Sequence, residues 1–155
     1  GVDYMKKKIG VLLLVLTTLV LTSGCSKESG TMTCTNEIKN GNYTTNLKAT
    51  ITYSKKVVDK VVTVEEIMTD EDSKAKDFKT LLDNYYVSYN KLEGFTNTVE
   101  VKNKKVISKT TIDYHAIDTD ALIKIDESNN ALIKDGKISI DDMKESYKQQ
   151  GARCR

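Results

Sequence analysis

Apolar and polar residues alternate along several stretches of this chain, and a period of two is the pattern of a half-buried β-strand. The clearest stretch is 43–53, in which Leu47, Ala49 and Ile51 alternate with polar residues. The other stretches are rich in β-branched residues, and turn-forming residues such as Gly41 separate them. The pattern predicts five antiparallel strands, over residues 31–39, 43–53, 57–68, 95–102 and 105–115.

Between the third and fourth strands the apolar spacing changes to three and four, which predicts an amphipathic helix over residues 70–92. Thr69 is suited to its N-cap, acidic residues follow, and Gly94 lies just beyond its expected end. A capping box at Ser139 predicts a C-terminal helix that ends near Gln150. The expected core residues are Ile51, Val62, Val64, Phe78, Leu82, Tyr85, Val99 and Ile112.

Tyr85, Tyr86 and Tyr89 recur on the long predicted helix. Such a row can stack against sugars or bases, and it can also be the face by which a helix packs on a sheet. The spacing of three and four favours packing. These elements together predict an α+β fold, an antiparallel β-sheet of about five strands packed against one long helix and a C-terminal helix.

The first 24 residues have the composition of a signal peptide. Lysines at Lys6 to Lys8 precede an apolar run over 9–21, which is shorter than the roughly 20 apolar residues that cross a bilayer. Small residues then lead to Cys25, the pattern of a bacterial lipoprotein signal, although the leucine lies one position earlier than is usual. We expect cleavage before Cys25 and a lipid, including palmitate, on this cysteine. The alternative is an ordinary secretory signal followed by a coincidental cysteine.

A lipid on Cys25 would anchor the protein to the extracytoplasmic face of a cell membrane. Residues 1–4 precede Met5, the expected initiator, so we treat them as an artefact of the gene start. Residues 25–30 are small and polar and predict a short lipidated tether. Residues 31–155 have a length typical of one compact domain.

The charge balance argues against a polyanionic partner. The whole chain has 24 basic and 22 acidic residues. Residues 1–24 carry three of the basic and one of the acidic residues, so the remaining chain has 21 of each. We therefore expect no nucleic-acid partner. Lysines near the hairpin ends are explained by solvated turns and protected sheet edges.

Two cysteines, Cys34 and Cys154, remain once Cys25 is lipidated. Exported proteins meet an oxidising compartment, so an even pair predicts a disulfide, here closing a loop of roughly 120 residues. The alternative is two free thiols. Two distant cysteines with a single histidine do not form a metal-ligand set, so we expect no metal.

The one histidine, His115, lies near Asp113, Asp118 and Asp120. A metal or acid–base site can be built from such residues, but Asp118 is suited to cap a short helical turn. The chain lacks the phosphate-binding, dinucleotide, zinc-protease, calcium-loop, nucleophile-elbow and dithiol redox motifs. The sequence therefore predicts no catalytic residue and no cofactor.

Several short stretches carry a family resemblance. They are LTSGC at 21–25, ATITY at 49–53 with the following strand, YNKLEGF at 89–95, TTIDY at 110–114, and GKISI at 136–140. With these motifs the chain resembles the YehR-like family of small bacterial lipoproteins. The resemblance implies an antiparallel sheet backed by helices, and it implies no activity. Cys34 and Cys154 are not part of the family pattern.

The sequence thus favours a membrane-anchored extracytoplasmic module that binds an envelope protein or another ligand and has no enzymatic role. The competing hypothesis is an envelope-acting enzyme, such as a hydrolase. A pocket with convergent polar groups and shifted pKa values would favour the enzyme.

Overall fold

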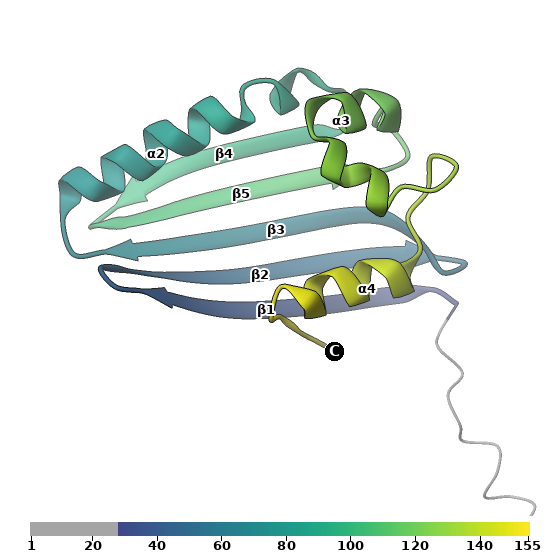
Figure 1. Cartoon of the computed structure of the whole chain (residues 1–155), viewed down its shortest axis with the longest axis horizontal. Helices are drawn as coiled ribbons and strands as arrows, with labels where there is room; N and C mark the ends of the chain where they lie inside the picture. The colour runs from purple at the N-terminus through teal and green to yellow at the C-terminus, as the bar shows by residue number, and fades with distance from the viewer. Residues whose placement is uncertain (1–27) are drawn as a thin grey trace, which may run out of the picture.

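The computed structural model describes residues 28–155, which form an α+β fold. Its strands are β1 (Gly30–Asn40), β2 (Tyr43–Ser54), β3 (Val57–Thr69), β4 (Phe95–Lys102), β5 (Lys105–Asp113) and β6 (Arg153–Cys154). All pair antiparallel in one sheet with the order β4-β5-β3-β2-β1-β6 (Figure 1). The five predicted strands are confirmed. The sixth was not predicted, because two residues are too few to show an alternating pattern.

The helices are α2 (Asp72–Tyr86), α3 (Thr119–Ile125) and α4 (Ile140–Gln149), with 3₁₀ turns η1 (Tyr89–Lys91) and η2 (Glu127–Ala131). They pack on one face of the sheet. On that face Ile51 shares a cluster with Met143 of α4, and Ile67 shares one with Ala75 of α2. Ile51 pairs with Val61, from which Ile67 is an even number of residues along β3, so both clusters lie on the same face. We call the opposite face, which no helix of residues 28–155 covers, the open face.

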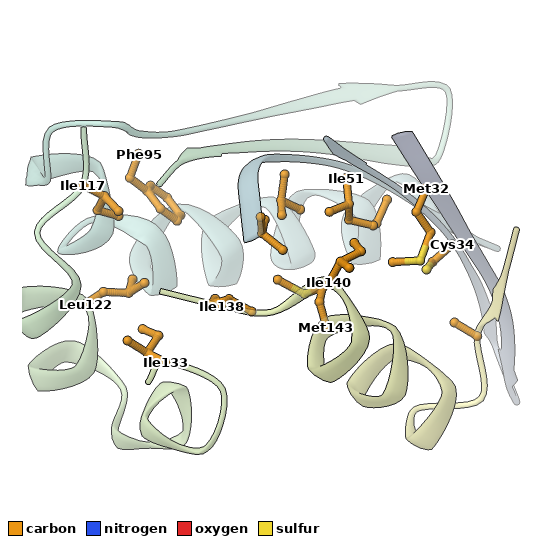
Figure 2. Packing of buried hydrophobic residues seen from close by; sticks show 14 of the residues in the cluster. Met32, Cys34, Ile51, Phe95, Ile117, Leu122, Ile133, Ile138, Ile140 and Met143 are labelled. Carbon is orange, nitrogen blue, oxygen red and sulfur yellow. The ribbon is translucent and has the colours of Figure 1, made fainter. Parts of the chain in front are cut away.

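The main core lies between the sheet and the segment from α3 to α4, as Figure 2 shows. Ile51 and Cys34 are fully buried there, and Val58 is 2% exposed. Side chains cap both helices of this segment. The Asp118 carboxylate accepts hydrogen bonds from two backbone N–H groups of α3, and the Ser139 hydroxyl accepts one from Asp142 N at 3.0 Å. Both predicted caps are confirmed.

The long predicted helix over 70–92 is wrong at both ends. The N-cap is Glu71, and the Thr69 hydroxyl instead lies within hydrogen-bond distance of the Glu71 and Lys104 carbonyls. The α-helix ends at Tyr86, and a 3₁₀ turn follows that buries Tyr89 against Phe95. Because a 3₁₀ turn also repeats about every three residues, the apolar spacing continued past the end of the helix. No helix within residues 28–155 is long and apolar enough to cross a membrane.

The expected core residues have three different fates. Ile51 is fully buried, while Phe78, Leu82, Val99 and Ile112 are half-buried and pack against the two clusters. Tyr85 was wrongly placed, since its side chain is 54% exposed. Val62 and Val64 were placed on the wrong side. They alternate with Val61 on β3 and therefore face the open side of the sheet.

Asn90 covers part of the exposed edge of β4. Its Oδ1 accepts a hydrogen bond from Asn97 N at 2.7 Å, and its Nδ2 donates to Asn97 O at 3.3 Å. The side-chain amide thus occupies the position that a neighbouring strand would take.

We expect Asn90→Ala to lower the free energy of unfolding by about 1–2 kcal/mol and to promote self-association through the freed strand edge. Urea unfolding and light scattering measure the two effects. Asn84→Ala is the control, because Asn84 is exposed on α2 and its side chain has no hydrogen bond to residues 28–155. Equal stability and equal scattering for the two variants would contradict the role of Asn90.

Candidate functional site

A disulfide between Cys34 and Cys154 fixes β6 to β1. Next to it, Thr33 and Arg155 exchange two backbone hydrogen bonds of 2.9 Å. The cysteines are therefore a non-hydrogen-bonded pair, the closer kind in an antiparallel ladder, and their Cα atoms lie 4.0 Å apart. This is the pairing predicted from the sequence, with a Cα separation below the usual range for disulfides of 4.4–6.8 Å.

The position of β6 adds an arginine to the open face. Arg153 pairs with Thr35 of β1, Thr35 pairs with Lys48 of β2, and Lys48 pairs with Val64 of β3. These four residues form one row across the sheet. Cys34 points toward the helices, so its neighbour Thr35 points the other way. The row therefore lies on the open face.

A cavity of about 710 Å³ lies over this row. Besides the four residues of the row, Glu37, Asn46 and Glu66 line it. Its volume lies within the roughly 300–1,000 Å³ that is common for small-molecule sites. Among the hollows of residues 28–155 described in this section, it is the larger one.

Of the charged side chains around this cavity, the acidic ones have ion-pair partners within residues 28–155 and the basic ones do not. Glu37 pairs with Lys39 at 3.1 Å, and Glu66 pairs with Lys105 at 3.2 Å. Lys48 and Arg153 have no carboxylate within ion-pairing distance among residues 28–155. The cavity thus contains two cations that are free to bind an external group, beside two acids that already have partners.

A second hollow, of about 220 Å³, lies on the helix-covered face and is lined by tyrosines. Tyr86 and Tyr89 pack with Phe95 at ring-centroid distances of 6.0 and 5.2 Å, and Tyr85 stacks on Tyr89 at 5.5 Å. Two of the tyrosines therefore pack on the sheet, as expected. The third packs on another tyrosine.

The polar groups of this tyrosine-lined hollow already have internal partners. Asn97 Nδ2 donates to the Ser108 and Thr110 hydroxyls at 2.9 Å each. The Asp126 carboxylate accepts from Ser128 N at 2.9 Å, and Asn129 Nδ2 donates to the Asp126 carbonyl at 3.0 Å. No buried side-chain polar atom of residues 28–155 lacks a partner. The polar side chains of this hollow therefore belong to the internal packing of the domain, and few of their hydrogen-bonding groups remain for a ligand.

Shifted pKa values follow burial on the same face of the sheet. Burial raises the pKa of Glu65, which faces the helices between the two hydrophobic clusters. Burial also raises the pKa of Tyr86, Tyr89 and Tyr147. Desolvation is the largest cause of each of these shifts, so the shifts by themselves identify no acid–base pair.

His115 meets a different aspartate from those expected. Its Nε2 lies 2.9 Å from Asp59 Oδ1, and Asp113 contacts only the His115 backbone N–H. Asp118 caps α3, as predicted. The Ser54 hydroxyl donates to the other oxygen of Asp59. The carboxylate thus stands between serine and histidine, whereas serine hydrolases place the histidine between the other two.

Residues 28–155 hold no cluster of three or more histidine, cysteine, aspartate or glutamate side chains suited to a metal ion. Cys25, the predicted lipidation site, lies outside the described residues.

Sequence reasoning assigned no functional role to Lys48 or Arg153. The alternation in β2 placed Lys48 on the polar face, because it follows Leu47 in a regular strand, but did not show what lies beside it. Arg153 gave no such signal. Its place depends on β6, and β6 depends on the pairing of two cysteines that are 120 residues apart.

The fold and the motifs agree with comparisons to known proteins. The sequence pattern of DUF1307, described as a protein family of unknown function, matches residues 31–153. The chain belongs to the DUF1307 family. No curated protein matches it.

Two solved structures share the fold of this DUF1307 protein. The NMR structure of the E. coli YehR protein has a TM-score of 0.60 at 17% identity, over 81% of this chain and 91% of that one. The NMR structure of a protein from Streptococcus pneumoniae TIGR4 has a TM-score of 0.56 at 15% identity, over 88% and 90%. The YehR-like resemblance seen in the motifs is thereby confirmed.

Proposed function

We propose that this DUF1307 protein is a lipid-anchored extracytoplasmic lipoprotein that binds a ligand on the open face of its sheet and has no enzymatic role. The signal-like segment that ends at Cys25 supports the anchor. The observation that carries the binding role is the 710 Å³ cavity with two unpartnered cations.

The start of the domain is fixed close to the proposed anchor. Lys56 N donates to Glu28 O at 2.7 Å, and Lys55 N donates to Ser29 Oγ at 3.2 Å. Three residues of chain, from Cys25 to Glu28, span at most about 11 Å. A lipid on Cys25 would therefore hold the β2–β3 turn near the membrane surface.

The cavity lies away from that end of the domain. Thr35 is five residues along β1 from Gly30, which corresponds to about 17 Å of strand. A soluble ligand could approach the open face there without meeting the membrane. This geometry supports a binding site that serves the space outside the membrane.

The enzyme hypothesis has weaker support. The Ser54, Asp59 and His115 group has the carboxylate in the middle, and the His115 side chain is 74% exposed. The Ser54 hydroxyl and the His115 imidazole each contact Asp59, whereas a nucleophile and its base would be hydrogen-bonded to one another. The open-face cavity has no histidine or cysteine in its lining.

The anchor is tested by Cys25→Ala. We expect the precursor to stay uncleaved and to incorporate no labelled palmitate, because the acceptor sulfur is gone. Labelling in cells followed by gel separation measures both. Ser26→Ala, which keeps the sulfur one residue away, should be labelled and cleaved normally. Normal palmitate labelling of Cys25→Ala would contradict the proposal that the protein is a lipoprotein.

A further inference from the structure

We propose that the open-face cavity binds an oxyanion group, a phosphate or a carboxylate, between Arg153 and Lys48. This inference rests on the proposed binding function and names the class of its ligand. It starts from the order of residues in the row across the sheet. Thr35 lies between the two cations, paired on one side with Arg153 and on the other with Lys48.

The spacing of the row suits one small anion. Neighbouring strands are about 4.8 Å apart, so each cationic residue starts about one strand away from Thr35. Both side chains are long enough to converge over the threonine. An arginine fork can donate two parallel hydrogen bonds to an oxyanion, a lysine adds a point charge, and the Thr35 hydroxyl supplies a further donor.

The two glutamates that line the cavity restrict where an anion can bind but do not prevent its binding. Glu37 and Glu66 would repel an anion, but each is within 3.2 Å of its own lysine. They lie in the next row, because Glu37 pairs with Asn46 and Asn46 pairs with Glu66. The anion is therefore expected on the Thr35 side, and Glu37→Gln should strengthen its binding.

The remaining wall indicates what the ligand carries besides its charge. Val64 continues the row on the far side of Lys48 and is half-buried in the floor. The cavity is several times larger than a phosphate ion would fill. The geometry therefore suits an anion attached to a larger, partly apolar body.

The disulfide gives this site a dependence on oxidation. Arg153 is next to Cys154, whose bond to Cys34 fixes β6 on β1. Without the bond, β6 is held by its backbone pairing with β1, in which Arg153 pairs with Thr35 and Arg155 exchanges two hydrogen bonds with Thr33, and by the buried Ala152 that precedes it. A reduced protein should therefore hold Arg153 less firmly and bind the anion more weakly, while Lys48 keeps its place.

The test titrates the mature protein, in a neutral detergent, with inorganic phosphate and with acetate at constant ionic strength. Amide NMR shifts of Thr35, Lys48 and Arg153 report binding. We expect saturable shifts at these residues, and Arg153→Gln and Lys48→Gln should each weaken binding by about tenfold, as loss of a charged hydrogen bond does. Relative affinities of the two probes distinguish a phosphate ligand from a carboxylate ligand.

Arg155→Gln is the matched control. It removes the same charge from the same face two residues away and does not line the cavity, so it should leave the affinity unchanged. Equal weakening by Arg155→Gln and Arg153→Gln, or shifts that never saturate, would show nonspecific charge attraction and overturn the site. The titration is independent of Cys25 labelling, so failure of the anion site and failure of the anchor are told apart.

Discussion

We expect replacement of both Cys34 and Cys154 by alanine to lower the free energy of unfolding by about 4–5 kcal/mol. The bond closes a loop with a sequence separation of 120, and the chain-entropy account assigns this magnitude to a loop of about that length. Urea unfolding of the oxidised, the reduced and the double-alanine protein measures the loss. Mass spectrometry with and without alkylation establishes the thiol state of each sample.

The loss should begin at the C-terminal end of the domain. Without the bond, β6 is held by its pairing with Thr35 and by the hydrogen bonds between Arg155 and Thr33, and the preceding turn is held by Asn36 Nδ2 donating to Gln150 O at 2.9 Å. Hydrogen exchange should therefore rise first at Arg155 and Thr33, then along α4. Identical unfolding curves for the oxidised and reduced protein would show that the bond adds no stability.

The strands could be predicted because their alternation is local. In β2, Leu47, Ala49 and Ile51 face the helices and their polar neighbours face outward, and the register agrees with this at each position. β3 is apolar on both faces, so its pattern did not show whether Val61 or Val62 faces the helices. The register with β2 shifts between Thr52 and Tyr53, because Asp59 of β3 has no partner there, and this bulge depends on tertiary pairing.

The candidate site could be predicted only in part. The expected export and the number of cysteines were enough to predict the pairing of Cys34 with Cys154, and the structure has this bond. The consequence of the bond, an arginine beside Thr35 and Lys48, was not accessible from sequence. It requires the register of three strands from distant parts of the chain. His115 shows the same limit, because its partner Asp59 lies 56 residues away.

Stability should also fall steeply in alkali. Burial raises the pKa of Tyr114 from 10.0 to about 12, since a charged phenolate is poorly solvated inside the domain. The folded state therefore holds this proton more tightly than the unfolded chain does. The stability from Tyr114 is fully present below pH 10 and is lost as the pH rises through about 12. The half-buried Tyr86 and Tyr147 add losses of the same sign.

The expected loss from Tyr114 alone is roughly 3 kcal/mol, at about 1.4 kcal/mol for each pH unit between the two pKa values. Urea unfolding between pH 8 and 12, with tyrosinate absorbance recorded on the same samples, measures it. Tyr114→Phe should unfold like the parent at pH 8 and be more stable than the parent at pH 12. Tyr85→Phe, which changes a 54% exposed side chain, should follow the parent throughout. Parallel curves for the parent and Tyr114→Phe would place the alkaline loss elsewhere, because burial of this hydroxyl would then make no difference between the two proteins.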